Sequence, residues 1–259
     1  MRSTDMKEIL YKLTNKEHYT IFVVGDSITE GARATSKEYT YTACLARGLA
    51  ARFPDRAVTR YDGKRYQTPD AELLPLERYS EPISVQSGNG SSITVVRSGI
   101  GGNTVQRLLN RQNDFIGREL GGHTADLFIV MVGINDAIES NPSKYAPPAV
   151  YLENLRTLVA LIQEKLPDAD LILMTPTYND DGLTPTSHLE PYADAMRSLC
   201  REQLIPLVDQ HRIWMEHQVV GGENFGQGSW LSGVRGDACH PSDLGHAAIA
   251  DAILQALFE

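Results

Sequence analysis

The chain has few cysteines and no long hydrophobic run, and each absence excludes a class of protein. Three cysteines occur among its 259 residues, at Cys44, Cys200 and Cys239. An odd number at such wide spacings argues against a disulfide framework, and no CxxC pair is present to hold structural zinc. Because no run reaches 18 apolar residues, no segment is predicted to cross a membrane.

Positive charge is also scarce. The 24 Lys and Arg residues against 33 Asp and Glu residues give a formal net charge of -9, with no local block of basic residues. Such a chain repels polyanions, so nucleic acid is not an expected partner. Residues 1–18 lack the apolar core of a signal peptide and are predicted to form an N-terminal helix. We therefore expect a cytoplasmic protein with no membrane partner.

Short apolar runs alternate with segments of helical periodicity. The runs are rich in β-branched residues, as is typical of strands buried on both faces of a parallel sheet. They span residues 19–25, 92–99, 126–133, 170–177 and 205–210. Helical spacing of apolar residues is found at 41–53, 149–166, 190–204 and 243–258. This alternation predicts an α/β fold, a three-layer α/β/α sandwich around a flavodoxin-like five-stranded parallel sheet, in a single domain of residues 1–259.

Residues 54–92 interrupt this alternation. The interval is polar and rich in proline, and two alternating runs flank Gly88-Asn89-Gly90 near its end. That pattern favours a hairpin, so we interpret the interval as a hairpin insertion that lengthens the second strand. It is also a candidate surface for contact between copies in a homo-oligomer.

Small and hydrogen-bonding residues follow three successive runs. Asp26 and Ser27 follow the first run, Gly102 and its glycine neighbours follow the second, and Asn135 follows the third. In open parallel sheets, the carboxyl ends of the strands meet at one edge, where ligands bind. The sequence therefore predicts a site at that edge.

A carboxylate and an imidazole precede the last helical segment. Asp237 and His240 are three residues apart, so a helical turn would make their side chains neighbours. The carboxylate can then accept the Nδ1 proton and leave Nε2 as a base aimed at Ser27. Serine is a poor nucleophile without such a base.

Taken together, these motifs resemble those of the SGNH (GDSL-type) hydrolase family over residues 19–258. The matching stretches are GDSITEG (25–31), SGIGGNT (98–104), GIND (133–136) and DACHP (237–241). The resemblance implies a serine ester hydrolase without a cofactor or metal. It implies Ser27 as nucleophile, Asp237 and His240 as its triad partners, and Ser27, Gly102 and Asn135 as the oxyanion hole.

Each motif alone has an ordinary structural interpretation as a helix cap or a turn, and only their order along the chain favours catalysis. A metal site built from Asp26, Asp237, His240 and His246 matches no known ligand spacing. An α/β-hydrolase elbow requires Gly-x-Ser-x-Gly, but position 29 is Thr.

The substrate is predicted from weaker signals. Residues 219–237 are rich in glycine and contain Trp230, whose ring can stack on a sugar or pin the loop to the core. Tyr178 follows the fourth run, and Arg235 precedes Asp237. With Asp26, which is also a candidate helix cap, these are the candidate substrate-binding residues.

These signals predict hydrolysis of short acyl esters, acetyl esters on carbohydrate hydroxyls above all, so the expected partner is a small-molecule or oligosaccharide ester. Three alternatives stay open. The first is an O-acyltransferase with the same triad, the second is a lipase or lysophospholipase-type esterase, and the third is a carbohydrate-binding module without catalysis.

Overall fold

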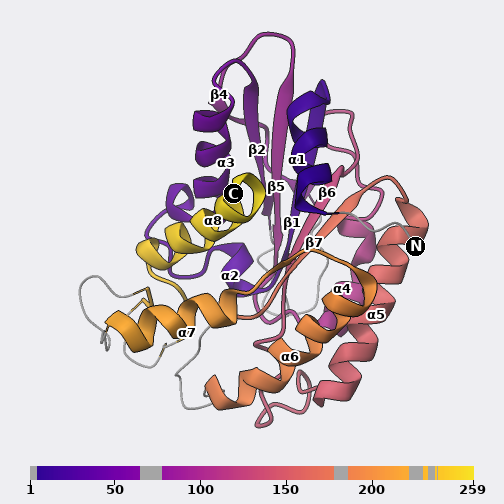
Figure 1. Ribbon diagram of the computed structural model, residues 1–259, viewed down its shortest axis with the longest axis vertical. Helices are drawn as coiled ribbons and strands as arrows, with labels where there is room; N and C mark the ends of the chain where they lie inside the picture. The colour runs from indigo at the N-terminus through magenta and orange to yellow at the C-terminus, as the bar shows by residue number, and fades with distance from the viewer. Residues whose placement is uncertain (1–4, 65–77, 178–185, 222–229, 233–236, 238) are drawn as a thin grey trace.

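The computed structural model describes residues 5–64, 78–177, 186–221, 230–232, 237 and 239–259. Within them, the strands form one eight-stranded sheet (Figure 1). The strands are β1 (His18–Gly25), β2 (Ala57–Lys64), β3 (Arg78–Tyr79), β4 (Ile83–Gln86), β5 (Ser92–Gly99), β6 (Leu127–Met131), β7 (Asp170–Met174) and β8 (Leu207–Val208). Their order is β3-β2-β5-β1-β6-β7-β8, and β4 also pairs with β2.

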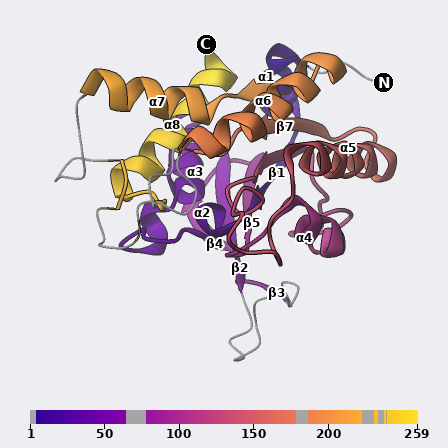
Figure 2. The same cartoon turned by 90° about the horizontal axis from the view of Figure 1, so that it is seen from below.

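Helices cover both faces of this sheet. They are α1 (Met6–Asn15), α2 (Ser27–Glu30), α3 (Tyr41–Arg52), α4 (Val105–Asn110), α5 (Pro148–Lys165), α6 (Thr186–Gln203), α7 (Gln210–Gly221) and α8 (Asp243–Phe258). Helices α3 and α8 pack together on one side, and α4 and α5 lie on the opposite side (Figure 2). The three-layer α/β/α architecture is therefore confirmed.

The five apolar runs are the strands β1, β5, β6, β7 and β8, which pair in parallel. Their order, with the second strand beside the first and the others on the far side, is that of flavodoxin-like folds. Strands β6 and β7 are buried at every residue, as continuous apolar runs require.

The predicted count of five parallel strands is too low. Strand β2 adds a sixth, paired in parallel with β5. Its sequence, AVTRYDGK, does not resemble a buried strand, yet Arg60 is 1% exposed and Asp62 is 2% exposed. Asp62 pairs with Arg60 and with Arg97 of β5, both at 3.2 Å, and Arg60 also pairs with Glu38. Mutual pairing of the charges allows a strand of polar residues to lie inside the protein.

An antiparallel hairpin does lie within residues 54–92, but its partners differ from those expected. Strands β3 and β4 both pair with β2, on the edge away from β5. The Gly88-Asn89-Gly90 turn therefore leads from the edge strand β4 to β5, across β2, and does not join two paired strands. The glycine pattern correctly predicted a turn, but it did not predict which strands pair on either side of that turn.

The register of the central strands aligns their carboxyl ends. Gly25 at the end of β1 pairs with Gly99 of β5 and with Met131 of β6. The segments that follow these three strands therefore start at one edge, as predicted for a parallel sheet. None of the helices in the described part of the chain combines the length and apolar character needed to span a bilayer.

Candidate active site

Ser27 is the first residue of a four-residue helix that begins where β1 ends. Asp26 caps this helix, since its carboxylate accepts a hydrogen bond of 2.9 Å from the N–H of Ile28. Gly31 ends the helix at a φ of 95°, which favours glycine. The strand, the cap and the tight exit together fix the position of the Ser27 hydroxyl.

Three side chains form a continuous hydrogen-bonded chain at this point. The Oγ of Ser27 lies 2.8 Å from Nε2 of His240, and Nδ1 of the same ring lies 2.8 Å from Oδ1 of Asp237. Asp237 is 9% exposed, and the His240 side chain is 22% exposed. Because the carboxylate accepts the Nδ1 proton, Nε2 is left with a lone pair that can accept the proton of Ser27.

Arg33 holds the second oxygen of the Asp237 carboxylate. Its Nε donates to Oδ2, while Oδ1 faces His240. Burial opposes ionisation of Asp237, but the hydrogen bonds from Arg33 and His240 outweigh it and lower the pKa of this carboxyl to about 2. The residue behind the imidazole is thus a fixed anion at neutral pH.

Gly102 and Asn135 lie on the loops that follow β5 and β6. Gly102 has a φ of 79°, and a Cβ there would lie 3.2 Å from Nη1 of Arg107 and 3.3 Å from Nζ of Lys144. The amide nitrogen of Asn135 donates to the Asn103 carbonyl at 3.0 Å, and its oxygen lies 3.4 Å from Nζ of Lys144. These contacts fix the amide and use one of its two N–H groups, so the second can bind a developing anion.

Asp136, next to Asn135, has a structural position. Its side chain is 0% exposed, and Oδ1 accepts a hydrogen bond of 3.2 Å from the N–H of Val105 at the start of α4. Among the described residues Oδ2 has no hydrogen-bond partner. Burial raises the pKa of Asp136 to about 7, and the nearby carboxyl of Asp26 adds to the rise.

This raised pKa predicts that the protein loses stability as the pH rises. The unfolded chain releases the Asp136 proton near pH 4, whereas the folded chain retains it up to about pH 7. The folded state therefore binds the extra proton in this window, and the free energy of unfolding falls as the pH increases.

The variant Asp136→Asn tests this prediction, because it keeps the acceptor for the Val105 N–H and removes the titrating group. Between pH 5 and 8 we expect the wild type to lose about 2–3 kcal/mol relative to this variant in urea unfolding. Parallel stability curves would contradict the assignment.

Two of the four candidate substrate-binding residues, Asp26 and Trp230, lie in the described part of the chain. Asp26 is 2% exposed and occupied as a helix cap, and burial raises its pKa to about 6. Trp230 stacks on His217 with ring centroids 3.6 Å apart and meets Trp214 edge-on at 5.3 Å. One face of the indole is thus covered by α7. Tyr178 and Arg235 lie outside the described residues.

His246 lies apart from the other candidate metal ligands that the sequence suggested. Its ring is buried and stacks on Tyr41, its Nδ1 accepts from the Tyr41 N–H at 3.4 Å, and its Nε2 donates to the Ala32 carbonyl at 3.1 Å. Burial lowers the pKa of this histidine to about 4. The neutral ring therefore holds the loop that follows α2.

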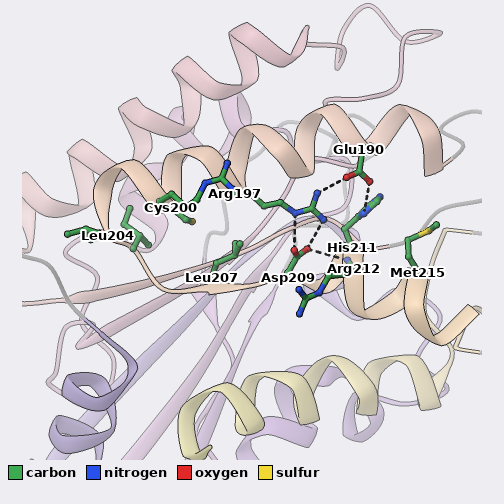
Figure 3. A pocket seen from close by; sticks show the side chains of 11 residues that line it. Glu190, Arg197, Cys200, Leu204, Leu207, Asp209, His211, Arg212 and Met215 are labelled. Carbon is green, nitrogen blue, oxygen red and sulfur yellow. Dashed lines mark hydrogen bonds and ion pairs between the residues drawn. The ribbon is translucent and has the colours of Figure 1, made fainter. Parts of the chain in front are cut away.

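A separate pocket of ≈ 810 Å³ lies along α6, β8 and α7 (Figure 3). Arg197 donates to Glu190 at 2.6 Å and to Asp209 at 2.8 Å, and His211 lies 3.2 Å from Glu190. The contacts among Glu190, Arg197, Asp209 and His211 thus tie α6 to the start of α7. None of the candidate site residues predicted from the sequence lines this pocket.

Arg33 and Lys144 were missed by the sequence analysis. Arg33 lies only two residues past the GDSITEG motif, but no spacing rule connects it to Asp237, which is 204 residues away. Lys144 follows the GIND motif by eight residues in a stretch without periodicity. The only sequence signal for either residue was a basic side chain close to a motif, and basic side chains are common on protein surfaces.

Comparison with known proteins identifies the family of the chain. The sequence matches the GDSL-like lipase/acylhydrolase family over residues 82–248, a range that contains Gly102, Asn135, Asp237 and His240 and begins after Ser27. No curated protein matches the chain.

Several solved structures share the fold. Axe2, an acetylxylan esterase from Geobacillus stearothermophilus, is 23% identical with a TM-score of 0.63, covering 93% of this chain and 94% of its own. LAE5, described as an alpha/beta hydrolase enzyme from the metagenome of Lake Arreo in Spain, is 24% identical with a TM-score of 0.63, covering 92% and 94%. CEX, a two-domain esterase active on acetylated mannans, is 18% identical with a TM-score of 0.63, covering 97% of this chain and 52% of its own.

The family match covers well over half of the chain, and the fold is that of the solved esterases. The matched range includes the loops that carry Gly102 and Asn135 and the segment that carries Asp237 and His240. The chain therefore belongs to the GDSL-like lipase/acylhydrolase family and is a serine carboxylic-ester hydrolase.

Proposed function

We propose that the protein removes acetyl groups from carbohydrate hydroxyls, with Ser27, His240 and Asp237 as its catalytic triad. The observation that carries this proposal is the hydrogen-bonded chain from Ser27 Oγ through both ring nitrogens of His240 to Asp237, with both contacts at 2.8 Å. The whole chain, residues 1–259, then acts as one catalytic domain.

In the first half of the reaction, Ser27 Oγ attacks the ester carbonyl as its proton passes to Nε2 of His240. The imidazolium that forms is stabilised by Asp237, which Arg33 keeps ionised and oriented. Nε2 then returns the proton to the departing sugar oxygen, leaving the acetyl group on Ser27 as an ester. In the second half, Nε2 takes a proton from a water molecule as that water attacks the acetyl carbonyl, and then returns the proton to Ser27 Oγ as acetate leaves.

The negative charge on the tetrahedral intermediate requires donors that are already in place. We assign this role to the N–H groups of Ser27 and Gly102 and to the amide of Asn135. As the first residue of a helix, Ser27 has an N–H without an acceptor in its own helix. The Lys144 ammonium, 3.4 Å from the Asn135 oxygen, holds the amide and adds positive charge nearby.

The acetyl preference is supported by the side chains around Ser27 and by the described activities of similar folds. Glu30, in the same helix as Ser27, accepts a 2.6 Å hydrogen bond from the N–H of Gly101, Arg33 donates to Asp237, and Lys144 donates to Asn135. A long acyl chain against charged groups gains little of the ~0.8 kcal/mol that each buried CH₂ contributes. Axe2 and CEX are described as acting on acetylated xylan and acetylated mannans.

We expect acetate release from acetylated xylo-oligosaccharides. For p-nitrophenyl esters, we expect a kcat/KM at least about tenfold higher for the acetyl ester than for the octanoyl ester, since the described side chains Glu30, Arg33 and Lys144 offer a longer chain charged groups and little apolar surface. Ser27→Ala provides the background rate for each substrate. A preference for the octanoyl ester would favour a lipase-type activity. Acyl transfer to an added sugar, at the expense of free acetate, would identify an O-acyltransferase.

A further inference from the structure

Cys239 lies against the triad, although the proposed reaction does not use it. Its Sγ is 3.5 Å from Oδ1 of Asp237 and 3.4 Å from Nδ1 of His240. The candidate ligand atoms of these three residues all lie within 4.8 Å of one another. Cys239 and His240 are both half-buried, so small ions can reach them from solvent.

The three atoms have nearly the spacing of a tetrahedral zinc site. With Zn–S of about 2.3 Å and Zn–N and Zn–O of about 2.0–2.1 Å, ligand atoms lie roughly 3.3–3.6 Å apart. The two contacts of the sulfur, at 3.4 and 3.5 Å, already satisfy this spacing. Two movements would complete the site: Nδ1 and Oδ1, now 2.8 Å apart, would have to separate by about half an ångström, and Sγ, which also lies 3.9 Å from Nε2 and therefore faces the side of the ring, would have to move toward the ring plane at Nδ1.

We propose that Asp237, Cys239 and His240 form an inhibitory binding site for thiophilic divalent cations such as Zn²⁺ and Cd²⁺. The inhibition rests on the proposed function, because it acts through the base of that reaction. The binding itself rests only on the three ligand atoms, with water completing the coordination.

The movement of protons explains why the bound ion inhibits. The Cys239 thiol releases its proton to solvent and binds as thiolate. The ion replaces the Nδ1 proton of His240, which moves to Nε2, since a neutral imidazole carries one proton. One proton is thus released for each ion bound. Nε2 then donates to Ser27 Oγ and cannot accept its proton, so the nucleophile is not activated.

The charges around the site select the type of ion. The Arg33 guanidinium occupies Oδ2 of Asp237, so only one carboxylate oxygen faces the ion, and a positive charge lies behind it. Ca²⁺ and Mg²⁺ require several oxygen ligands and gain nothing from a thiolate. Zn²⁺ and Cd²⁺ bind thiolate strongly, so they should inhibit where Ca²⁺ and Mg²⁺ do not.

Cys44 offers a matched control within the same chain. It is also half-buried, but its sulfur accepts a hydrogen bond of 3.3 Å from Arg47. The groups of His, Cys and carboxylate ligands found in the described residues do not include it. A general effect of thiol binding would therefore appear at Cys44 as well as at Cys239.

The test compares wild type, Cys239→Ser and Cys44→Ser. Initial rates on an acetyl ester are measured with increasing ZnCl₂, then after addition of a chelator, with CaCl₂ and MgCl₂ as negative controls. We expect reversible inhibition of the wild type and of Cys44→Ser, and at least a tenfold higher half-inhibitory concentration for Cys239→Ser. Equal sensitivity of the two serine variants would overturn the proposal.

A second readout does not depend on activity. CdCl₂ titration is followed by the ultraviolet charge-transfer absorption of cadmium thiolate and by proton release in weak buffer. We expect both signals in wild type and Cys44→Ser, and a loss of both in Cys239→Ser. Signals that persist in Cys239→Ser would refute the site. If they follow Cys239 while no ester is hydrolysed, the metal site stands and the proposed function fails.

Discussion

Replacing Ser27 by alanine should lower kcat on acetyl esters by about 10⁶-fold, because the reaction loses its nucleophile and leaves His240 nothing to activate. The free energy of unfolding should change little, because Ser27 is a half-buried residue whose neighbour Asp26 provides the helix cap. The measurement is the rate of acetate release, together with urea unfolding of both proteins.

A matched control for this variant is Ser143→Ala. Ser143 is exposed, and its hydroxyl donates to the nearby side chain of Asn141 at 2.7 Å. A serine-reactive fluorophosphonate should label the wild type and Ser143→Ala but not Ser27→Ala. Labelling that persists in Ser27→Ala, with activity retained, would show that another residue is the nucleophile.

Replacing Asn135 by alanine should have the second largest effect, a loss of about 10²–10³ in kcat with a small change in KM. The reason is that the amide donates to negative charge that develops only in the transition state, so substrate binding is largely preserved. The measurement is the separation of kcat and KM on an acetyl ester at saturating and subsaturating concentrations.

Stability must be measured in the same experiment, because Asn135 also donates to the buried backbone of Asn103. Loss of that bond should cost about 1–3 kcal/mol of unfolding free energy. Asn15→Ala, which removes an exposed amide that donates to the Tyr11 carbonyl within α1, controls for general effects of amide loss. A higher KM at unchanged kcat would contradict an oxyanion role and indicate that Asn135 binds substrate.

The local hydrophobic pattern predicted the apolar strands such as β6, and it failed to predict strand β2, which carries charged residues. The continuous run at β6 could only be a buried segment, and its length favoured a strand. Strand β2 carries Arg60 and Asp62 at buried positions, and no rule for a single segment predicts that these charges will meet partners. Arg97, which pairs with Asp62, lies on a strand 35 residues away.

The same limit applies to the candidate site. Ser27 was singled out by its place after an apolar strand, and His240 by its spacing from Asp237. The contact between Ser27 and His240, at 2.8 Å, joins residues 213 positions apart and forms only when the segments that carry them pack together. The contact of Arg33 with Asp237 has the same origin and no signature in the sequence.

Patterns within short segments of sequence were enough to predict the sheet-and-helix layers, the residues at the carboxyl ends of β1, β5 and β6, and the family to which they point. These features depend on neighbours within a few residues, where periodicity and turn chemistry act. Tertiary packing set the place of β2 in the sheet, the contact of Arg33 with Asp237 and the contact of Ser27 with His240. Those contacts depend on burial and on charge pairing between distant segments, which are fixed only when the whole chain packs.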